Sequence, residues 1–196
     1  MAADDARLLP GARSLLAALA LSVGGCALTQ DPVREPEPPA PSSDPSLYAR
    51  RWTWTDELGE PVQLARWRGK PLVVTAVFTT CKATCPRTIE RLRVVHARFL
   101  AERRDAKFVL VTLDPANDTP ERLRRFKTEQ GLPASWTFLH GEKGQTRELV
   151  KMLGIHLMDL DDHIMHDGAI VVFDERGVAS RSYTGWGIDE EGPPVI

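Results

Sequence analysis

The chain has 196 residues, of which 42% are hydrophobic and 27% charged, an ordinary globular composition that supplies one domain with a buried core. Its formal net charge of −2 at pH 7 gives no electrostatic case for a nucleic-acid partner. We therefore expect one globular domain and exclude nucleic acid as a partner.

The first 25 residues are typical of a lipoprotein signal peptide. Arg7 and Arg13 precede the short apolar core LLAALALSV (15–23), and two glycines then lead to Cys26. This core is too short to span a bilayer, which needs about 20 apolar residues. The pattern resembles a bacterial lipoprotein signal, which implies cleavage before Cys26 and a lipid on its sulfur. An ordinary secretory signal with a chance cysteine is the alternative.

Residues 26–46 predict a tether. They are rich in Pro, Ser and acidic residues and nearly free of large apolar side chains, so burial cannot offset the entropy lost on ordering them. Six prolines favour an extended, polyproline-like spacing. We expect a folded domain at 47–196, exported to the periplasmic side of a bacterial membrane and lipid-anchored there.

The first part of this domain predicts a hairpin, a buried strand and a helix. Apolar and polar residues alternate around Gly59 within 51–70, which indicates a short hairpin at a sheet edge. The continuous apolar, β-branched run 71–78 predicts a central strand that is buried on both faces. Pro86 suits the first turn of a helix, and apolar residues then recur at three- and four-residue steps to about residue 102.

The second part alternates strands with helices. Residues 107–113 predict a second buried strand, 119–131 a helix and 144–154 a shorter helix. Residues 169–185 predict two strands joined by a turn at DERG. This order predicts an α/β domain with a mixed, largely parallel sheet that is flanked by helices on both faces.

Cys81 and Cys85 fall at the carboxyl end of the predicted central strand, where open α/β sheets place their sites. If the segment is helical, residues four apart share one face, and the two sulfurs can then bond or share a metal. A helix N-terminus stabilises a thiolate, and Lys82 adds to this effect if it points inward. A purely stabilising disulfide is the weaker interpretation, because so short a loop constrains the unfolded chain little.

The cysteine spacing and the histidines favour a metal. Three residues separate the cysteines, whereas the usual redox motif of thioredoxin-like oxidoreductases has two. Two thiolates suit Cu(I), and an imidazole completes a trigonal site. His166 is the best third ligand, because it precedes the last buried strand, and in a thioredoxin-like sheet that loop approaches the cysteine loop. His163 is a rival or a fourth ligand, and two Cys with two His equally suit tetrahedral Zn(II).

The other three histidines are interpreted as structural. His96 lies on the first predicted helix, and His140 and His156 lie in predicted loops without an evident partner. A competing interpretation also exists for the segment DLDDHIMHD (159–167), whose two histidines would merely form hydrogen bonds to its aspartates.

Three segments within residues 52–177 together resemble the Sco/SenC family, exported thioredoxin-like copper proteins that assemble the Cu-A centre of cytochrome c oxidase. TDELGEPVQLARWRGKPLVVTAVFTTCKATCP (55–86) is similar to the family's hairpin, Gly-Lys strand entry and Cys-x-x-x-Cys-Pro motif. LDPANDTPERL (113–123) resembles its Asp-Pro-x-x-Asp-Thr-Pro segment. HDGAIVVFDERG (166–177) resembles the segment in which a copper-binding His opens a strand.

The resemblance implies a thioredoxin-like sheet with an N-terminal hairpin, copper as the cofactor, and Cys81, Cys85 and His166 as its ligands. Asp114 and Asp118 match acidic family positions near the site, although Asp118 or Thr119 is also suited to cap the next helix. Lys82 and Asp167 depart from the family pattern, in which Pro follows the first Cys and Ser or Thr follows the His.

Two functions from different classes remain open. The first is a membrane-tethered metallochaperone that delivers copper to the copper-centre subunit of a respiratory oxidase. The second is a thiol:disulfide oxidoreductase that keeps a client's copper-ligand cysteines reduced, with Cys81 attacking as a thiolate and Cys85 resolving. A peroxiredoxin-like peroxidase is disfavoured, because that family's Pro-x-x-x-Thr-x-x-Cys pattern is absent. A tethered module with an inert bridge is the last alternative.

Overall fold

The computed structural model describes residues 44–160 and 163–184. The predicted signal peptide, Cys26 and most of the predicted tether lie outside these residues. Within the described ranges, no helix combines the length and the apolar character needed to cross a membrane. The helices are η1 (Leu47–Ala49), η2 (Leu64–Trp67), α1 (Thr84–Ala101), α2 (Pro120–Glu129) and α3 (Lys143–Met152). The strands are β1 (Trp54–Asp56), β2 (Pro61–Val62), β3 (Leu72–Val77), β4 (Lys107–Thr112), β5 (Thr137–His140), β6 (Leu157–Leu160), β7 (His163–His166), β8 (Ala169–Phe173) and β9 (Ala179–Thr184).

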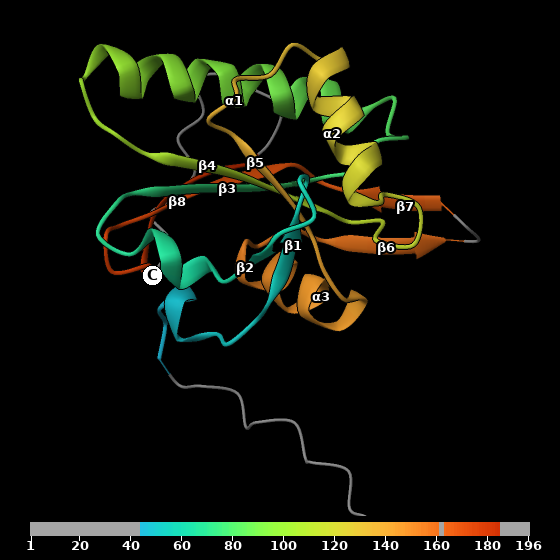
Figure 1. Ribbon diagram of the computed structural model, residues 1–196, viewed down its shortest axis with the longest axis horizontal. Coiled ribbons are helices and arrows are strands. Elements are labelled where there is room, and N and C mark those ends of the chain that lie inside the picture. The colour runs from blue at the N-terminus through green and yellow to red at the C-terminus, as the bar shows by residue number, and fades with distance from the viewer. Residues whose placement is uncertain (1–43, 161–162, 185–196) are drawn as a thin grey trace, which may run out of the picture. The chain divides into compact units, whose positions relative to one another are not determined.

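A seven-stranded sheet forms the centre of the domain, with the order β2-β1-β5-β4-β3-β8-β9. Helices α1 and α2 cover one face and α3 the other (Figure 1), as the alternation of strands and helices predicted. Only β3, β4 and β5 run parallel to one another; every other pairing in this sheet is antiparallel. The mixed sheet is therefore confirmed, but the expectation that it is largely parallel was wrong.

Strand β3 lies at the centre because its sequence is apolar on both faces. All six of its residues are buried, and it pairs with β4 on one side and β8 on the other. Its one polar side chain, Thr75, donates a hydrogen bond of 2.7 Å to the carbonyl oxygen of Ala169. Each buried aliphatic side chain contributes about 1.5–3 kcal/mol to the free energy of unfolding. The end of β3 is consequently a rigid base for the loop that follows.

The hairpin, the central strand and the three helices agree with the sequence prediction, but two features were missed. Strand β5 was missed, so His140, expected in a loop, instead ends a strand. Strands β6 and β7 form a separate antiparallel hairpin, where the sequence analysis expected only the loop that precedes the last buried strand. Both regions are short strands of four residues, for which periodicity is a weak signal.

Candidate metal centre

The two cysteines lie where β3 gives way to α1. Because α1 begins only at Thr84, Cys81 precedes the helix, and the condition for the two cysteines to share one helix face is not met. Instead, the backbone N–H of Cys85 donates to Sγ of Cys81 over 3.3 Å. Both thiols are free; Cys81 is half-buried, whereas Cys85 is only 1% exposed. The backbone N–H of Phe78 donates to Sγ of Cys85 over 3.4 Å.

His166 brings an imidazole to this pair from the end of β7. Its Nε2 lies 3.9 Å from Sγ of Cys85, and the ligand atoms of Cys81, Cys85 and His166 all lie within 4.8 Å of one another. The Nδ1 of His166 is 2.8 Å from the carbonyl oxygen of Asp167. A carbonyl can only accept, so the proton is on Nδ1 and the lone pair on Nε2 faces the sulfur.

Burial sets the protonation of this site. Burial raises the pKa of the Cys85 thiol far above its ordinary value, and the nearby Cys81 and Asp118 act in the same direction. Burial also lowers the pKa of His166, against the opposing effect of its bond to Asp167. At neutral pH the imidazole is therefore ready to bind a metal, whereas Cys85 must first release a proton.

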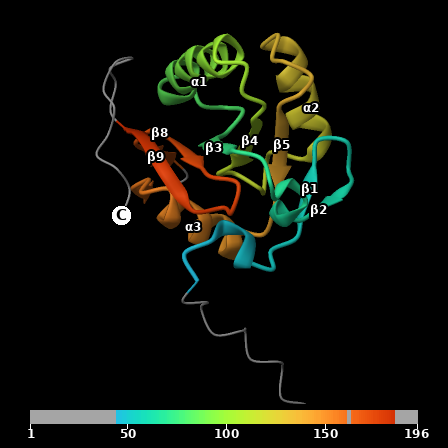
Figure 2. The ribbon, with the colours of Figure 1, turned by 90° about the vertical axis from the view of Figure 1, so that its left-hand side faces the viewer.

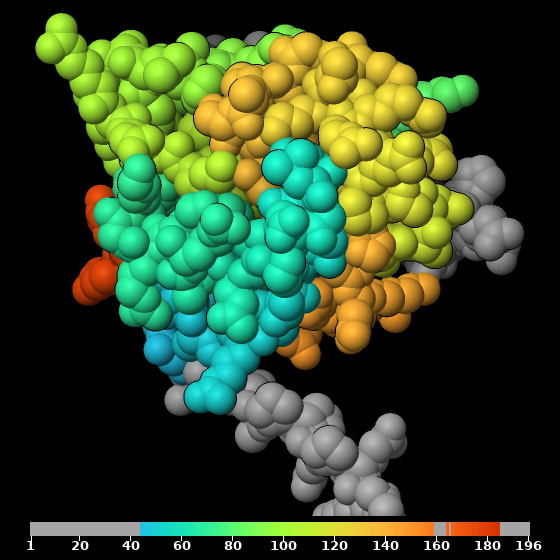
Figure 3. Space-filling model, in the orientation of Figure 1, coloured from blue at the N-terminus to red at the C-terminus, as the bar shows by residue number. Residues whose placement is uncertain are grey.

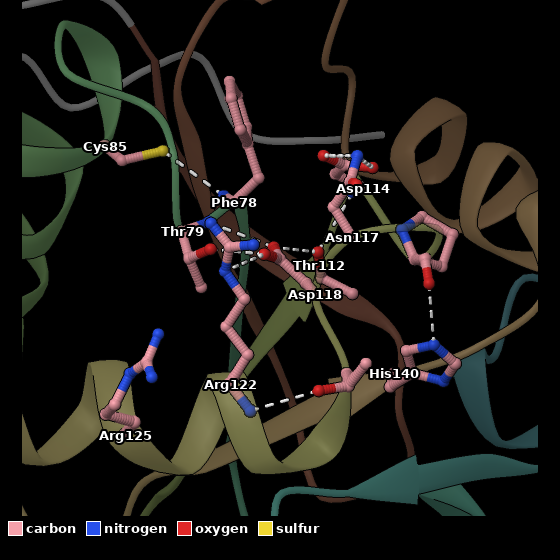
Figure 4. Close-up of polar contacts among 12 residues, drawn as sticks. Phe78, Thr79, Cys85, Thr112, Asp114, Asn117, Asp118, Arg122, Arg125 and His140 are labelled. Atoms are coloured by element: carbon pink, nitrogen blue, oxygen red, sulfur yellow. Dashed lines mark hydrogen bonds and ion pairs between the residues drawn. The ribbon is translucent and has the colours of Figure 1, made fainter.

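Asp118 holds the cysteine loop in place. Its side chain is fully buried, and its Oδ2 accepts from the backbone N–H of Thr79 (3.0 Å) and from the hydroxyl of Thr112 (2.6 Å). The hydroxyl of Thr79 also donates to Oδ1. Figure 4 shows Asp118 at the centre of this network, which links the ends of β3 and β4 to the start of α2. The cap of α2 is Thr119 instead, whose hydroxyl accepts from the N–H of Arg122.

Asp114, the other acidic candidate, joins this network only through its backbone, whose N–H donates to the hydroxyl of Thr112 over 3.0 Å. Both of its carboxylate oxygens accept from the amide of Asn117, at 3.0 and 2.9 Å. It lines a cavity of about 800 Å³, together with His140, whose Nε2 lies 3.0 Å from the carbonyl oxygen of Pro115 (Figure 4).

The remaining predicted residues have structural or exposed positions. His96 packs edge-on against the rings of Phe108 and Trp136, at centroid distances of 4.8 and 5.6 Å. His156 is exposed and contacts both carboxylate oxygens of Asp167, which ties the start of β6 to the end of β7. These contacts support the structural interpretation of His96 and His156. Lys82 is exposed, and the side chain of His163 lies outside the described part of the site.

Gly168 is a residue that sequence reasoning missed. A Cβ at this position would lie 2.9 Å from Oγ1 of Thr88 on α1, a distance that real Cβ atoms essentially never show. Glycine thus allows the chain after His166 to approach the helix that carries Cys85. The glycine of the HDG segment was visible in the sequence, but the need for it comes from Thr88, which is 80 residues away in the sequence.

The donor set of this centre fits a soft metal ion. Two sulfurs and one neutral imidazole nitrogen are the ligands that Cu(I) prefers, and a trigonal arrangement needs no fourth protein ligand. Cys81 is accessible enough for an incoming ligand to reach it, while Cys85 and His166 are shielded. The arrangement is therefore suited to hold a metal ion and to exchange it on the side of Cys81.

The sheet, its flanking helices and the free thiol pair at the carboxyl end of β3 define a thioredoxin-like domain with a potential metal centre. The model of the SCO1/SenC family matches residues 40–190. The chain therefore belongs to the SCO1/SenC family.

Three comparisons illustrate the relationship. A SCO1 protein homolog of Bacillus subtilis is 23% identical over 148 residues, which cover 72% of this chain and 77% of the relative. The crystal structure of Arabidopsis thaliana ScoI with copper bound has a TM-score of 0.62 at 17% identity and covers 70% of this chain and 88% of that one. BsSco, described as a Sco-family cytochrome c oxidase assembly protein with a disulfide switch, has a TM-score of 0.62 at 21% identity, covering 74% and 86% of the two chains.

Proposed function

We propose that this protein binds one copper ion through Cys81, Cys85 and His166 and delivers it to the Cu-A centre of a respiratory oxidase. The protein works outside the cytoplasm, on the periplasmic side of a bacterial membrane, where a lipid on Cys26 holds it. It is a metallochaperone rather than an enzyme.

One observation carries the proposal: two thiol sulfurs and an imidazole nitrogen from separate parts of the chain lie within 4.8 Å of one another. Cys81 and Cys85 come from the end of β3 and the start of α1, and His166 comes from β7. The copper bound to Arabidopsis thaliana ScoI and the oxidase-assembly role stated for BsSco agree with this choice of metal and client.

Delivery would proceed by ligand exchange. Cys81 is the most accessible of the three ligands, so a thiol of the client approaches there and replaces it first. Cys85 and His166 hold the ion until the client supplies further ligands. The exchange changes neither the oxidation state of the copper nor that of the thiols.

An anaerobic titration of the reduced protein with Cu(I), against a chelator of known affinity, tests the proposal. X-ray absorption should show one copper with two sulfur ligands and one imidazole, and His166→Ala should remove the imidazole and weaken binding. His140→Ala is the matched control, because His140 contacts Pro115 and none of the three ligands. The variant His163→Ala decides whether a second imidazole joins the site. Failure of the reduced protein to compete with a moderate chelator contradicts the proposal.

A second candidate is thiol:disulfide exchange, which the contact between Sγ of Cys81 and the N–H of Cys85 favours. A helix N–H that points at a sulfur stabilises its thiolate, and Cys81 is the accessible thiol, so Cys81 would attack and Cys85 would resolve. Reduction of a model disulfide by the dithiol, unchanged in His166→Ala but lost in Cys81→Ser and Cys85→Ser, would support redox exchange over metal transfer.

The lipid anchor has its own test. Mass spectrometry of the N-terminal peptide should show Cys26 as the first residue, carrying the mass of a diacylglyceryl group. Cys26→Ser should abolish the added mass, and a high-salt wash should then release the protein from the membrane fraction. A mature N-terminus elsewhere, with no added mass, would identify an ordinary secretory signal.

A further inference from the structure

Although the net charge is only −2, basic and acidic residues are unevenly distributed over the chain. Three segments, 65–70, 98–107 and 174–181, contain nine Arg and Lys but only four Asp and Glu. The first segment precedes β3, the second precedes β4 and the third follows β8. Because β4 is parallel and β8 antiparallel to β3, all three meet at the amino ends of β3 and β4. We call these three segments the basic edge. The total charge gave no reason to expect such a local excess.

Specific contacts hold the basic edge together. The N–H of Gly69 donates to the carbonyl oxygen of Glu175 over 2.9 Å, which joins the first segment to the third. Lys70 forms an ion pair with Asp105, which joins the first segment to the second. Figure 2 looks onto this end of the domain, and in Figure 3 the three segments, coloured teal, yellow-green and orange-red, come together along the left margin.

Several of these positive charges face solvent. Arg66, Arg68 and Arg103 are exposed, and among the described residues no carboxylate lies within ion-pair distance of any of them. The guanidinium of Arg66 lies 5.8 Å from the ring centroid of Trp67, and that of Arg68 lies 5.3 Å from the ring of Tyr48. Such contacts leave the charge available to an external anion.

Apolar and aromatic groups lie among these charges. Leu100, in the last turn of α1, is 63% exposed, although large hydrophobic side chains of this chain are mostly buried. Trp67 is half-buried, and the side chains of Arg66 and Lys107 both lie over its ring. Basic residues interspersed with an exposed leucine and a tryptophan are typical of surfaces that rest in the headgroup region of a bilayer.

The point at which the chain enters the domain also favours a bilayer as the partner of the basic edge. The described part of the domain begins at Asp44. Two hydrogen bonds then join the chain to the third segment: the hydroxyl of Ser46 donates to the carbonyl oxygen of Arg176 over 2.6 Å, and the N–H of Leu47 donates to the carbonyl oxygen of Gly177 over 2.7 Å. The described chain therefore enters the domain beside the third segment of the basic edge, and the segment that contains Cys26 precedes this point in the sequence. A membrane reached through that segment meets this edge at high local concentration.

We propose that the basic edge binds the phosphate headgroups of an anionic phospholipid bilayer. This binding is independent of copper and adds a second, electrostatic contact to whatever holds the N-terminal segment. The metal centre lies at the other end of β3, a strand of six residues that spans about 20 Å. The bound domain consequently presents Cys81 and Cys85 away from the bilayer.

The test uses the full chain with Cys26→Ser, so that no lipid contributes, and sedimentation with vesicles. One set of vesicles is pure phosphatidylcholine, and the other contains about 30% phosphatidylglycerol; the first measures any binding by the apolar run 15–23. The test variant is Arg66→Glu/Arg68→Glu/Arg103→Glu. The matched control, Arg124→Glu/Arg125→Glu/Lys151→Glu, makes the same change in net charge at exposed positions outside the basic edge.

We expect binding to the phosphatidylglycerol vesicles that weakens as salt is raised and exceeds binding to phosphatidylcholine. The test variant should bind at least about a hundredfold more weakly, because each basic residue near an anionic surface contributes about fivefold and the three glutamates are repelled by it. The control should bind nearly as the parent does, with unchanged circular dichroism and melting temperature in both variants.

Equal losses in the two variants would show a mere net-charge effect and overturn the proposal. So would equal binding to both kinds of vesicle. Binding of an acidic polypeptide or polyphosphate at the basic edge without vesicle binding would overturn it in favour of a soluble polyanion. Copper titration of the same variants separates the two proposals, because copper affinity should remain unchanged in every charge variant.

Discussion

The backbone N–H of Thr79 donates a 3.0 Å hydrogen bond to Oδ2 of Asp118, which ties the loop before Cys81 to the start of α2. The two residues are 39 positions apart in the sequence. A buried carboxylate that accepts several hydrogen bonds fixes the groups that donate to it, since each donor loses a partner if the loop moves. The position of the first cysteine thus depends on a residue that contributes no ligand atom to the centre.

Asp118→Ala should lower the free energy of unfolding by about 3 kcal/mol, because the half-buried N–H of Thr79 and the buried hydroxyl of Thr112 would lose their acceptor. Chemical denaturation measures this loss. Cu(I) affinity should also fall, since the cysteine loop is no longer held. Asp118→Asn keeps one acceptor oxygen and should lie between the parent and Asp118→Ala in both measurements. Unchanged copper affinity in a folded Asp118→Ala protein would contradict the positioning role.

Apparent Cu(I) affinity should rise with pH. Burial raises the pKa of Cys85, so this thiol is protonated over the range from about pH 6.5 to 8, and copper must displace its proton. Each displaced proton makes the affinity about tenfold higher per pH unit. The lowered pKa of His166 leaves its imidazole neutral in this range, where it adds no slope.

Competition with a chelator at several pH values, after correction for the chelator's own protonation, measures this slope. His166→Ala should bind more weakly at every pH but retain the slope of the parent. A flat profile would mean that Cys85 is already a thiolate or does not bind the metal.

Gly168→Ala should weaken copper binding by displacing the chain beside His166. The added methyl group would lie 2.9 Å from Oγ1 of Thr88, so either α1 or the segment between β7 and β8 must move. We expect a loss of about 1–3 kcal/mol in stability, as for other overpacked sites, together with a longer or lost copper–imidazole contact in X-ray absorption. The double variant Gly168→Ala/Thr88→Ser keeps the hydroxyl and should not restore copper binding. The double variant Gly168→Ala/Thr88→Ala removes the hydroxyl and should restore part of it.

The buried ion pair between Lys127 and Glu57 should matter for stability and not for copper. The Nζ of Lys127 lies 2.6 Å from Oε1 of Glu57, whose Oε2 accepts from the N–H of Phe138 over 2.9 Å. Lys127→Met leaves a buried carboxylate without its partner and should cost about 3–5 kcal/mol in the free energy of unfolding.

The double variant Glu57→Gln/Lys127→Met removes both charges and should recover part of that loss. Copper affinity of the folded variants should equal that of the parent, because the pair lies between the β1–β2 turn, α2 and β5. A change in copper affinity would show that this region is coupled to the metal centre.

The sequence by itself determined the elements whose signals are local. The apolar run of β3, the periodic apolar face of α1 and the Thr-Pro start of α2 each specify their element without reference to the rest of the chain. The two cysteines could be assigned to the end of the central strand for the same reason. His166 was chosen from five histidines only through its place before the last strand and a family resemblance.

The tertiary structure decided what depends on distant partners. The acidic segment around His163 pairs with β6 to form a hairpin, a long-range choice that its polar sequence does not specify. Asp114 and Asp118 look alike in the sequence, yet only Asp118 is buried against Thr79 and Thr112. The basic edge likewise forms only when three segments meet at one end of the sheet. Local sequence fixes backbone preference, but burial and electrostatic fields depend on which segments the fold brings together.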